Sequence, residues 1–141
     1  MEMHESADYA AGGWFSTAPD LVKFLRGMSG ASSNKLFKND ESWKLMQETL
    51  EFAIYKSSDS GREYHYGLGL FIDDMGEAEG ERLIGHFGYY GSFALLWPKG
   101  NVVMVGTYGQ GKPSSEYKMR WGQFRVDVFK AVSESLSLKL E

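Results

Sequence analysis

The sequence predicts an α+β fold in which two helices precede an antiparallel sheet of about four strands and a long helix follows it. Apolar residues recur at helical spacing in the first third and at the end of the chain. Between these parts, short apolar segments are separated by turns rich in glycine, proline and asparagine, which is typical of hairpins. The length of 141 residues suits one domain or part of a larger one, and we see no internal repeat and no linker.

The first helix is predicted to begin near Thr17. The Thr17 hydroxyl can cap the helix, Pro19 fits the first turn because its missing N–H needs no partner there, and Asp20 complements the positive end of the dipole. The apolar face is formed by Leu21, Phe24, Leu25 and Met28. Glycine and serine between residues 29 and 34 are expected to end the helix.

Two further helices are predicted from the same kind of evidence. One starts at Asn39 or Asp40, and its apolar side carries Trp43, Met46 and Leu50. The polar segment 56–63 after it is expected to be a loop. The long final helix starts at Ser114 or Ser115, and its apolar face is formed by Tyr117, Trp121, Phe124, Val128, Val132 and Leu136.

Four strands are predicted, over residues 66–72, 82–87, 92–97 and 102–108. The connections are an acidic loop over 73–81, a glycine- and tyrosine-containing turn over 88–91 and a tight turn over 98–101. The last strand is almost wholly apolar, which indicates cover on both faces and neighbours on both sides. Either the sheet is larger in its natural setting, or it pairs with a second copy, or the two early helices cover its second face.

Composition excludes several classes of function. Fifteen Lys and Arg against nineteen Asp and Glu give a net charge of −4, so we expect no nucleic-acid partner. The absence of cysteine excludes disulfides and cysteine-based zinc sites. No apolar run approaches the roughly 20 residues that a membrane span needs, and no leader-like segment opens the chain.

Metal sites are also not expected. His4 and His65 have no ligand partner at a spacing that suits zinc. The acidic residues of the 73–81 segment show no fixed oxygen-ligand spacing, so a solvated loop is the expected reading. These residues are Asp73, Asp74, Glu77, Glu79 and Glu81.

Three motifs occur in series. They are GGWFSTAPDLVKF at 12–24, YGLG at 66–69 and GHFG at 85–88, the last followed by Gly91-Ser92 and PKGN at 98–101. Their order and spacing resemble those of the serine β-lactamase-like hydrolases, which include class C β-lactamases, DD-peptidases, D-aminopeptidases and related esterases. The resemblance covers roughly residues 9–136.

The resemblance implies a C-terminal part of such an enzyme, so that residues 1–141 form a single partial domain. In that family a Ser-x-x-Lys helix start supplies nucleophile and base, and a Tyr-x-Asn or Ser-x-Asn element supplies a second proton-transfer group. Both precede the first motif by a long stretch, whereas only about a dozen residues precede it here. The implied parent is a bacterial periplasmic, extracellular or envelope-associated hydrolase that acts through an acyl-serine on an amide, ester or β-lactam, without metal or cofactor. This chain alone is then expected to be inactive.

By the same resemblance, the third wall of the active site comes from the third motif. His86 would face the cleft and assist hydrogen bonding or proton transfer, and Tyr89, after the motif glycine Gly88, would give its N–H to the oxyanion hole. Phe87 stands where the family usually has Thr or Ser, which favours an esterase- or aminopeptidase-like parent. The expected catalytic residues are His86, Gly88 and Tyr89, and the expected substrate-binding residues are Phe87, Tyr90 and Ser92.

Alternatives remain open at this point. Ser32 with Lys35 and Ser115 with Lys118 also match Ser-x-x-Lys, but a helix cap explains Ser115 more simply. His86 could be an ordinary strand residue, and the tyrosines could be explained by cross-strand packing. The whole chain could instead be a small non-enzymatic binding domain that forms a homodimer through a sheet edge.

Overall fold

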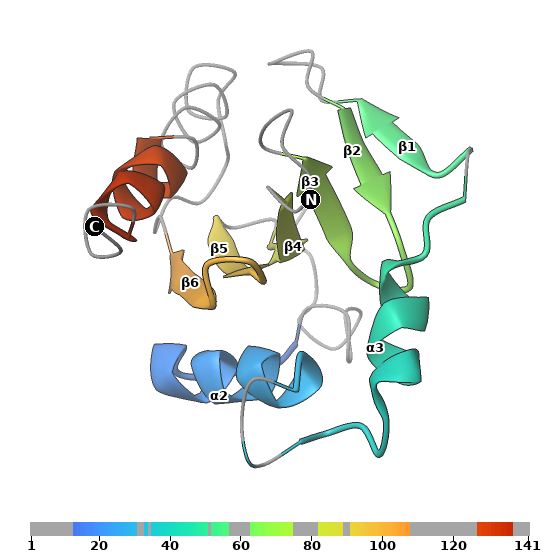
Figure 1. The fold of residues 1–141 in the computed structure, drawn as a ribbon, viewed down its shortest axis with the longest axis horizontal. Coiled ribbons are helices and arrows are strands. Elements are labelled where there is room, and N and C mark those ends of the chain that lie inside the picture. The colour runs from blue at the N-terminus through green and yellow to red at the C-terminus, as the bar shows by residue number, and fades with distance from the viewer. Residues whose placement is uncertain are drawn as a thin grey trace.

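A computed structural model describes residues 13–30, 33, 35–50, 52–56, 63–74, 82–88, 91–107 and 127–136 (Figure 1). The fold is α+β, as the sequence predicts. Helices α2 (Ala18–Met28) and α3 (Asp40–Gln47) come first. Six strands follow, namely β1 (Ile54–Lys56), β2 (Glu63–Tyr66), β3 (Phe71–Asp74), β4 (Arg82–Phe87), β5 (Ser92–Trp97) and β6 (Val102–Thr107). Residues 127–136 are helical.

The six strands form one antiparallel sheet in chain order, β1 to β6. Strands β4 and β5 coincide with the predicted ranges, and β6 agrees with its predicted range as far as the structure describes it. The turn predicted over 98–101 is present, with an N–H···O bond of 3.1 Å from Asn101 to Pro98. Local turn chemistry therefore predicted this half of the sheet correctly.

The expected number of about four strands is wrong, and so is the single strand predicted over residues 66–72. Tyr66 ends β2 and Phe71 begins β3, and residues 67–70 between them form a turn closed by a 2.9 Å bond from the Gly67 N–H to the Leu70 carbonyl. Gly69 has φ 75°, a conformation that glycine adopts without steric cost. The alternating leucines suggested an extended chain, but the two glycines allow it to reverse.

The loop predicted over 56–63 and the acidic loop predicted over 73–81 are also shorter than expected, because strands include their end residues. Lys56 ends β1 and Glu63 begins β2, and their side chains form an ion pair at 3.3 Å. Asp73 and Asp74 belong to β3, and Asp73 is only 2% exposed, so it is not part of a solvated loop. Strand β1 carried no signal because all three of its residues are exposed.

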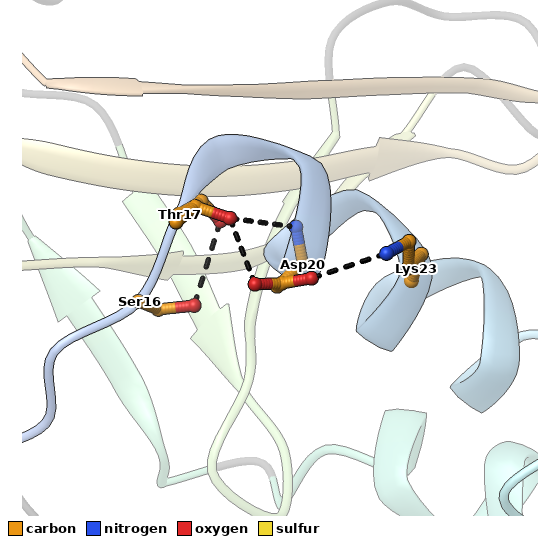
Figure 2. Close-up of polar contacts among 4 residues, drawn as sticks. All are labelled: Ser16, Thr17, Asp20 and Lys23. Atoms are coloured by element: carbon orange, nitrogen blue, oxygen red, sulfur yellow. Dashed lines mark hydrogen bonds and ion pairs between the residues drawn. The ribbon is translucent and has the colours of Figure 1, made fainter.

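Helix α2 begins as the sequence predicts (Figure 2). The Thr17 hydroxyl oxygen accepts from the Asp20 N–H at 3.3 Å, and the hydroxyl donates to the Asp20 carboxylate at 2.8 Å. Lys23 adds an ion pair at 3.2 Å to the other carboxylate oxygen. The pKa of Asp20 lies below its ordinary value. The largest cause is the hydrogen bond from Thr17, and the hydrogen bond and positive charge of Lys23 lower it further.

Thr17→Ala is expected to lower the free energy of unfolding by about 1 kcal/mol, the usual cost of losing an N-cap. It should also raise the pKa of Asp20, because the largest cause of its lowering is removed. The contribution of Asp20 to the free energy of unfolding is present above the pKa that this carboxyl has in the unfolded chain. It is lost as the pH falls through the lower pKa of the folded state. Urea unfolding and NMR titration measure the two effects. Ser16→Ala, which removes an exposed hydroxyl bonded to the Thr17 carbonyl at 3.4 Å, is the control and should change neither.

The sheet lies between two helical layers. On one face, Leu83, Leu95 and Trp97 pack with Phe129 of the C-terminal helical residues 127–136. On the other, Leu70 and Ile84 pack with side chains of α2, α3 and the segment between them, namely Met28, Phe37, Trp43 and Met46. Figure 1 shows the sheet between α2 and the C-terminal helical residues. The two early helices thus cover the second face, which was one of the three readings left open.

Strand β6 lies at the edge of the described sheet. It pairs with β5 along its whole length, from Val102 opposite Trp97 to Thr107 opposite Ser92. Its residues are half-buried except for exposed Thr107. Cover on both faces is thus achieved, whereas the predicted neighbour on its second side is not found among the described residues.

Candidate functional site

The hairpin between β4 and β5 brings four of the six predicted site residues together. His86 and Phe87 end β4, Gly88 follows, and Ser92 opens β5. The Gly88 N–H donates to the Ser92 carbonyl at 2.8 Å. Tyr89 and Tyr90 lie outside the described residues, so the oxyanion role of Tyr89 and the binding role of Tyr90 stay predictions.

Close contacts and backbone conformation constrain the glycines of this hairpin. A Cβ at Gly85 would lie 1.9 Å from the Ala94 carbonyl oxygen, a backbone atom, so glycine is required there, whereas a Cβ at Gly88 would lie 2.1 Å from the Ser92 hydroxyl oxygen, a side-chain atom that would have to move. Gly91 has φ 85°, where other residues are strained. The third motif therefore sets a tight backbone around His86.

His86 is exposed and makes two hydrogen bonds through its ring. Nδ1 lies 2.8 Å from the Phe87 carbonyl oxygen, and Nε2 lies 2.9 Å from the Tyr66 hydroxyl oxygen. A carbonyl can only accept, so Nδ1 must carry a proton. In the neutral ring, Nε2 is then the acceptor and the Tyr66 hydroxyl is the donor.

Aromatic rings surround this histidine. The aromatic cluster consists of Tyr55, Tyr64, Tyr66, Phe71, His86 and Phe87. Phe71 is central, with its ring centroid 4.7 Å from that of Tyr66, 4.8 Å from that of His86 and 5.7 Å from that of Phe87. Aromatic packing across the strands, one of the two interpretations of the tyrosines, is observed for Tyr64 and Tyr66, whereas Tyr89 and Tyr90 lie outside the described residues. The Phe87 ring belongs to this packing, and it offers no hydroxyl to a ligand.

Tyr66 is the site residue that sequence reasoning missed as a polar partner. It precedes the turn of the second motif, and that turn docks on α3 through a 3.0 Å bond from the Leu68 N–H to the Met46 carbonyl. A Cβ at Gly67 would lie 2.2 Å from the same carbonyl oxygen, so the close approach requires glycine. The signal in the sequence that could have identified Tyr66 was the occurrence of the second motif, which it opens, together with the third motif, which contains His86.

The competing site candidates gain no support. Lys35 lies 3.6 Å from the Asp40 carboxylate in an exposed ion pair, while Ser32, Ser115 and Lys118 lie outside the described residues. Asp74 pairs with Arg82 across the β3–β4 hairpin at 3.4 Å.

Two further findings concern the described part of the chain. No group of three or more histidine, aspartate or glutamate side chains in it could hold a metal ion. Its helices are also too short or too polar to cross a membrane.

Comparison with known proteins identifies the family of this chain. A family model described as Beta-lactamase matches residues 1–124. No curated protein and no solved structure gives a significant match. The matched range is most of the chain and contains all three motifs, together with the hairpin that carries His86. The chain therefore belongs to the Beta-lactamase family.

Proposed function

We propose that the chain is part of a serine hydrolase that transfers an acyl group through a serine ester, and that the β4–β5 hairpin forms one wall of its active site. The proposal rests on one observation. His86 is exposed near the end of β4, two hydrogen bonds hold its ring, and it belongs to the third motif of a chain of the Beta-lactamase family. An imidazole in such a place can donate to or accept from a reacting group.

The nucleophile and its base are proposed to lie outside these 141 residues. In one of the two Ser-x-x-Lys matches, Lys35 forms an ion pair with Asp40. Both matches follow the first motif, whereas in the resembled family the Ser-x-x-Lys element precedes it. The hairpin then supplies a wall and an oxyanion donor, which stabilise a tetrahedral intermediate only when a serine attacks beside them. This chain alone should be catalytically silent.

The proposed substrates are esters or amides without a carboxylate beside the reacting bond. The Phe87 ring packs 5.7 Å from Phe71 and 6.5 Å from Tyr64, measured between centroids. A hydroxyl at this position would bind a substrate carboxylate, and a hydrogen bond to a charged group is worth roughly 1.5–3 kcal/mol. Without that hydroxyl, ester substrates are favoured over β-lactams and D-Ala-D-Ala peptides.

The 141-residue chain is expected to show no mass shift after treatment with a fluorophosphonate and no hydrolysis of p-nitrophenyl acetate. A longer protein that adds an upstream Ser-x-x-Lys helix should be labelled at that serine, and should hydrolyse the acetate ester faster than nitrocefin. Lys35→Met in the longer protein is the matched control and should leave both reactions unchanged. An adduct on any serine of the 141-residue chain would contradict the proposal.

A second candidate is a binding domain that dimerises through β6. The observation in its favour is that β6 lies at the edge of the sheet formed by the described residues, and its six residues carry no charge, whereas charge is a usual protection of an edge strand. Sedimentation equilibrium separates the two candidates. A stable dimer of a chain whose longer form shows no hydrolysis supports the second, and a monomer at all concentrations excludes it.

A further inference from the structure

We propose that Tyr66 is the positioning residue for His86: its hydroxyl holds Nε2 and so fixes where the imidazole points, while the Phe87 carbonyl keeps the proton on Nδ1. The hydrogen bond stands independently of any activity. Its catalytic consequence rests on the proposed function, because it assumes that His86 faces a substrate.

The tautomer follows from the Phe87 carbonyl. This carbonyl requires a proton on Nδ1, at 2.8 Å, because the opposite tautomer would place the Nδ1 lone pair against the lone pairs of the carbonyl oxygen. The Tyr66 hydroxyl can donate or accept, so it adapts to this form by donating to Nε2, at 2.9 Å. The carbonyl therefore selects the tautomer, and the hydroxyl holds the second ring nitrogen in place.

Tyr66 is itself held by groups outside the β4–β5 hairpin. Its N–H donates to the Ala53 carbonyl at 2.9 Å, and its Cα pairs with that of Phe71 across β2 and β3. Its ring stands edge-on to the Phe71 ring at 82° and 4.7 Å. A residue fixed by β2, β3 and the turn on α3 can hold the imidazole while the hairpin beside it receives a ligand.

The pair has a defined polarity toward a ligand. In the neutral state, the Tyr66 proton goes to Nε2 and the Nδ1 proton goes to Phe87, so only lone pairs of the Tyr66 oxygen remain available. Such a site accepts from a ligand N–H or O–H, as in an amide or an alcohol leaving group. When Nε2 takes up a proton it donates to the Tyr66 oxygen, and the Tyr66 hydroxyl proton becomes free to donate to a ligand oxygen. Among the described residues that contact the His86 ring or pair with His86 across the sheet, only Tyr66 carries an ionisable group, since Phe71 from β3 and Ala94 from β5 have none.

Tyr66→Phe tests the proposal, because it keeps the ring on Phe71 and removes only the hydroxyl. Long-range ¹H–¹⁵N spectra report the tautomer of each histidine ring, at a pH where titration of the same signals shows the ring to be neutral. His86→Asn identifies the His86 signals. The unsubstituted chain should show the Nδ1–H form with Nε2 as a hydrogen-bond acceptor, and Tyr66→Phe should shift the His86 Nε2 signal toward that of a ring nitrogen that accepts no hydrogen bond.

Tyr55→Phe is the matched control, since it removes a hydroxyl from the same aromatic cluster at a ring that lies 6.0 Å from Phe71. It should leave the His86 signals unchanged. A predominant Nε2–H form in the unsubstituted chain would overturn the proposal, and this result does not depend on the folding of Tyr66→Phe. An unchanged His86 Nε2 signal in Tyr66→Phe would overturn it as well.

Kinetics of the longer protein separate this proposal from the proposed function. Tyr66→Phe should lower kcat there and leave KM nearly unchanged, since it disturbs a positioned group rather than ligand binding. If the longer protein shows no hydrolysis at all, the proposed function fails, whereas the Nε2 signal in Tyr66→Phe still decides whether Tyr66 holds His86.

Discussion

Phe129→Ala is expected to lower the free energy of unfolding by about 3–5 kcal/mol, the usual cost of deleting a buried aromatic ring. Phe129 is 7% exposed, and its ring lies 4.9 Å from that of Trp97 at 66°. The two rings join the C-terminal helical residues to Leu83 and Leu95 of the sheet. Removing the ring leaves a cavity beside Trp97 and releases the helix from that face. Urea unfolding of the 141-residue chain measures the change.

Phe52→Ala is the matched control, because the same ring is deleted where it is 84% exposed. Its effect should stay within about 0.5 kcal/mol. Equal losses for the two variants would contradict the packing of the C-terminal helical residues on the sheet.

The parts of the fold that could be predicted depend on neighbours in sequence. Helix α2 begins directly after Thr17 because this N-cap residue and Asp20, its hydrogen-bond partner, are three residues apart. Strands β4 and β5 were predicted because each is bounded by turn residues. The start of α3 at Asp40, with the Asn39 side chain accepting from the Ser42 N–H, has the same local origin.

The parts that could not be predicted depend on residues distant in sequence. Strand β1 exists through its pairing with β2, and its own three residues are exposed. Leu68 and Leu70 suggested a strand because they alternate with glycine, as apolar residues do in a strand. The same alternation occurs here in a turn that packs on α3, a helix distant in sequence. Burial of Asp73 in β3 could not be foreseen from an acidic segment.

The same distinction applies to the candidate site. His86 was found because the third motif is contiguous in sequence, whereas its bond to Tyr66 spans 20 residues and requires the register of β2, β3 and β4. The Phe87 substitution was visible in the sequence, but its packing on Phe71 was not. Motifs thus identified the residues, and sheet register determined which of them touch.

Gly85→Ala is expected to lower the free energy of unfolding by about 3 kcal/mol or more and to displace the neighbouring His86. The new Cβ would lie 1.9 Å from the Ala94 carbonyl oxygen and 2.9 Å from the Leu95 Cα. Both are backbone atoms of β5, so they can yield only if β4 and β5 separate. Denaturant unfolding measures the loss, and the His86 ring signals report the displacement.

Gly69→Ala separates this steric effect from the loss of glycine itself. A Cβ at Gly69 meets nothing within 4 Å, but φ of 75° is unfavourable for alanine by about 1–2 kcal/mol. It should therefore cost less than Gly85→Ala and leave the His86 signals in place. If Gly85→Ala costs no more than Gly69→Ala, β5 does not approach β4 as closely as the structure shows, because a Cβ at Gly85 would then have room beside the Ala94 carbonyl oxygen.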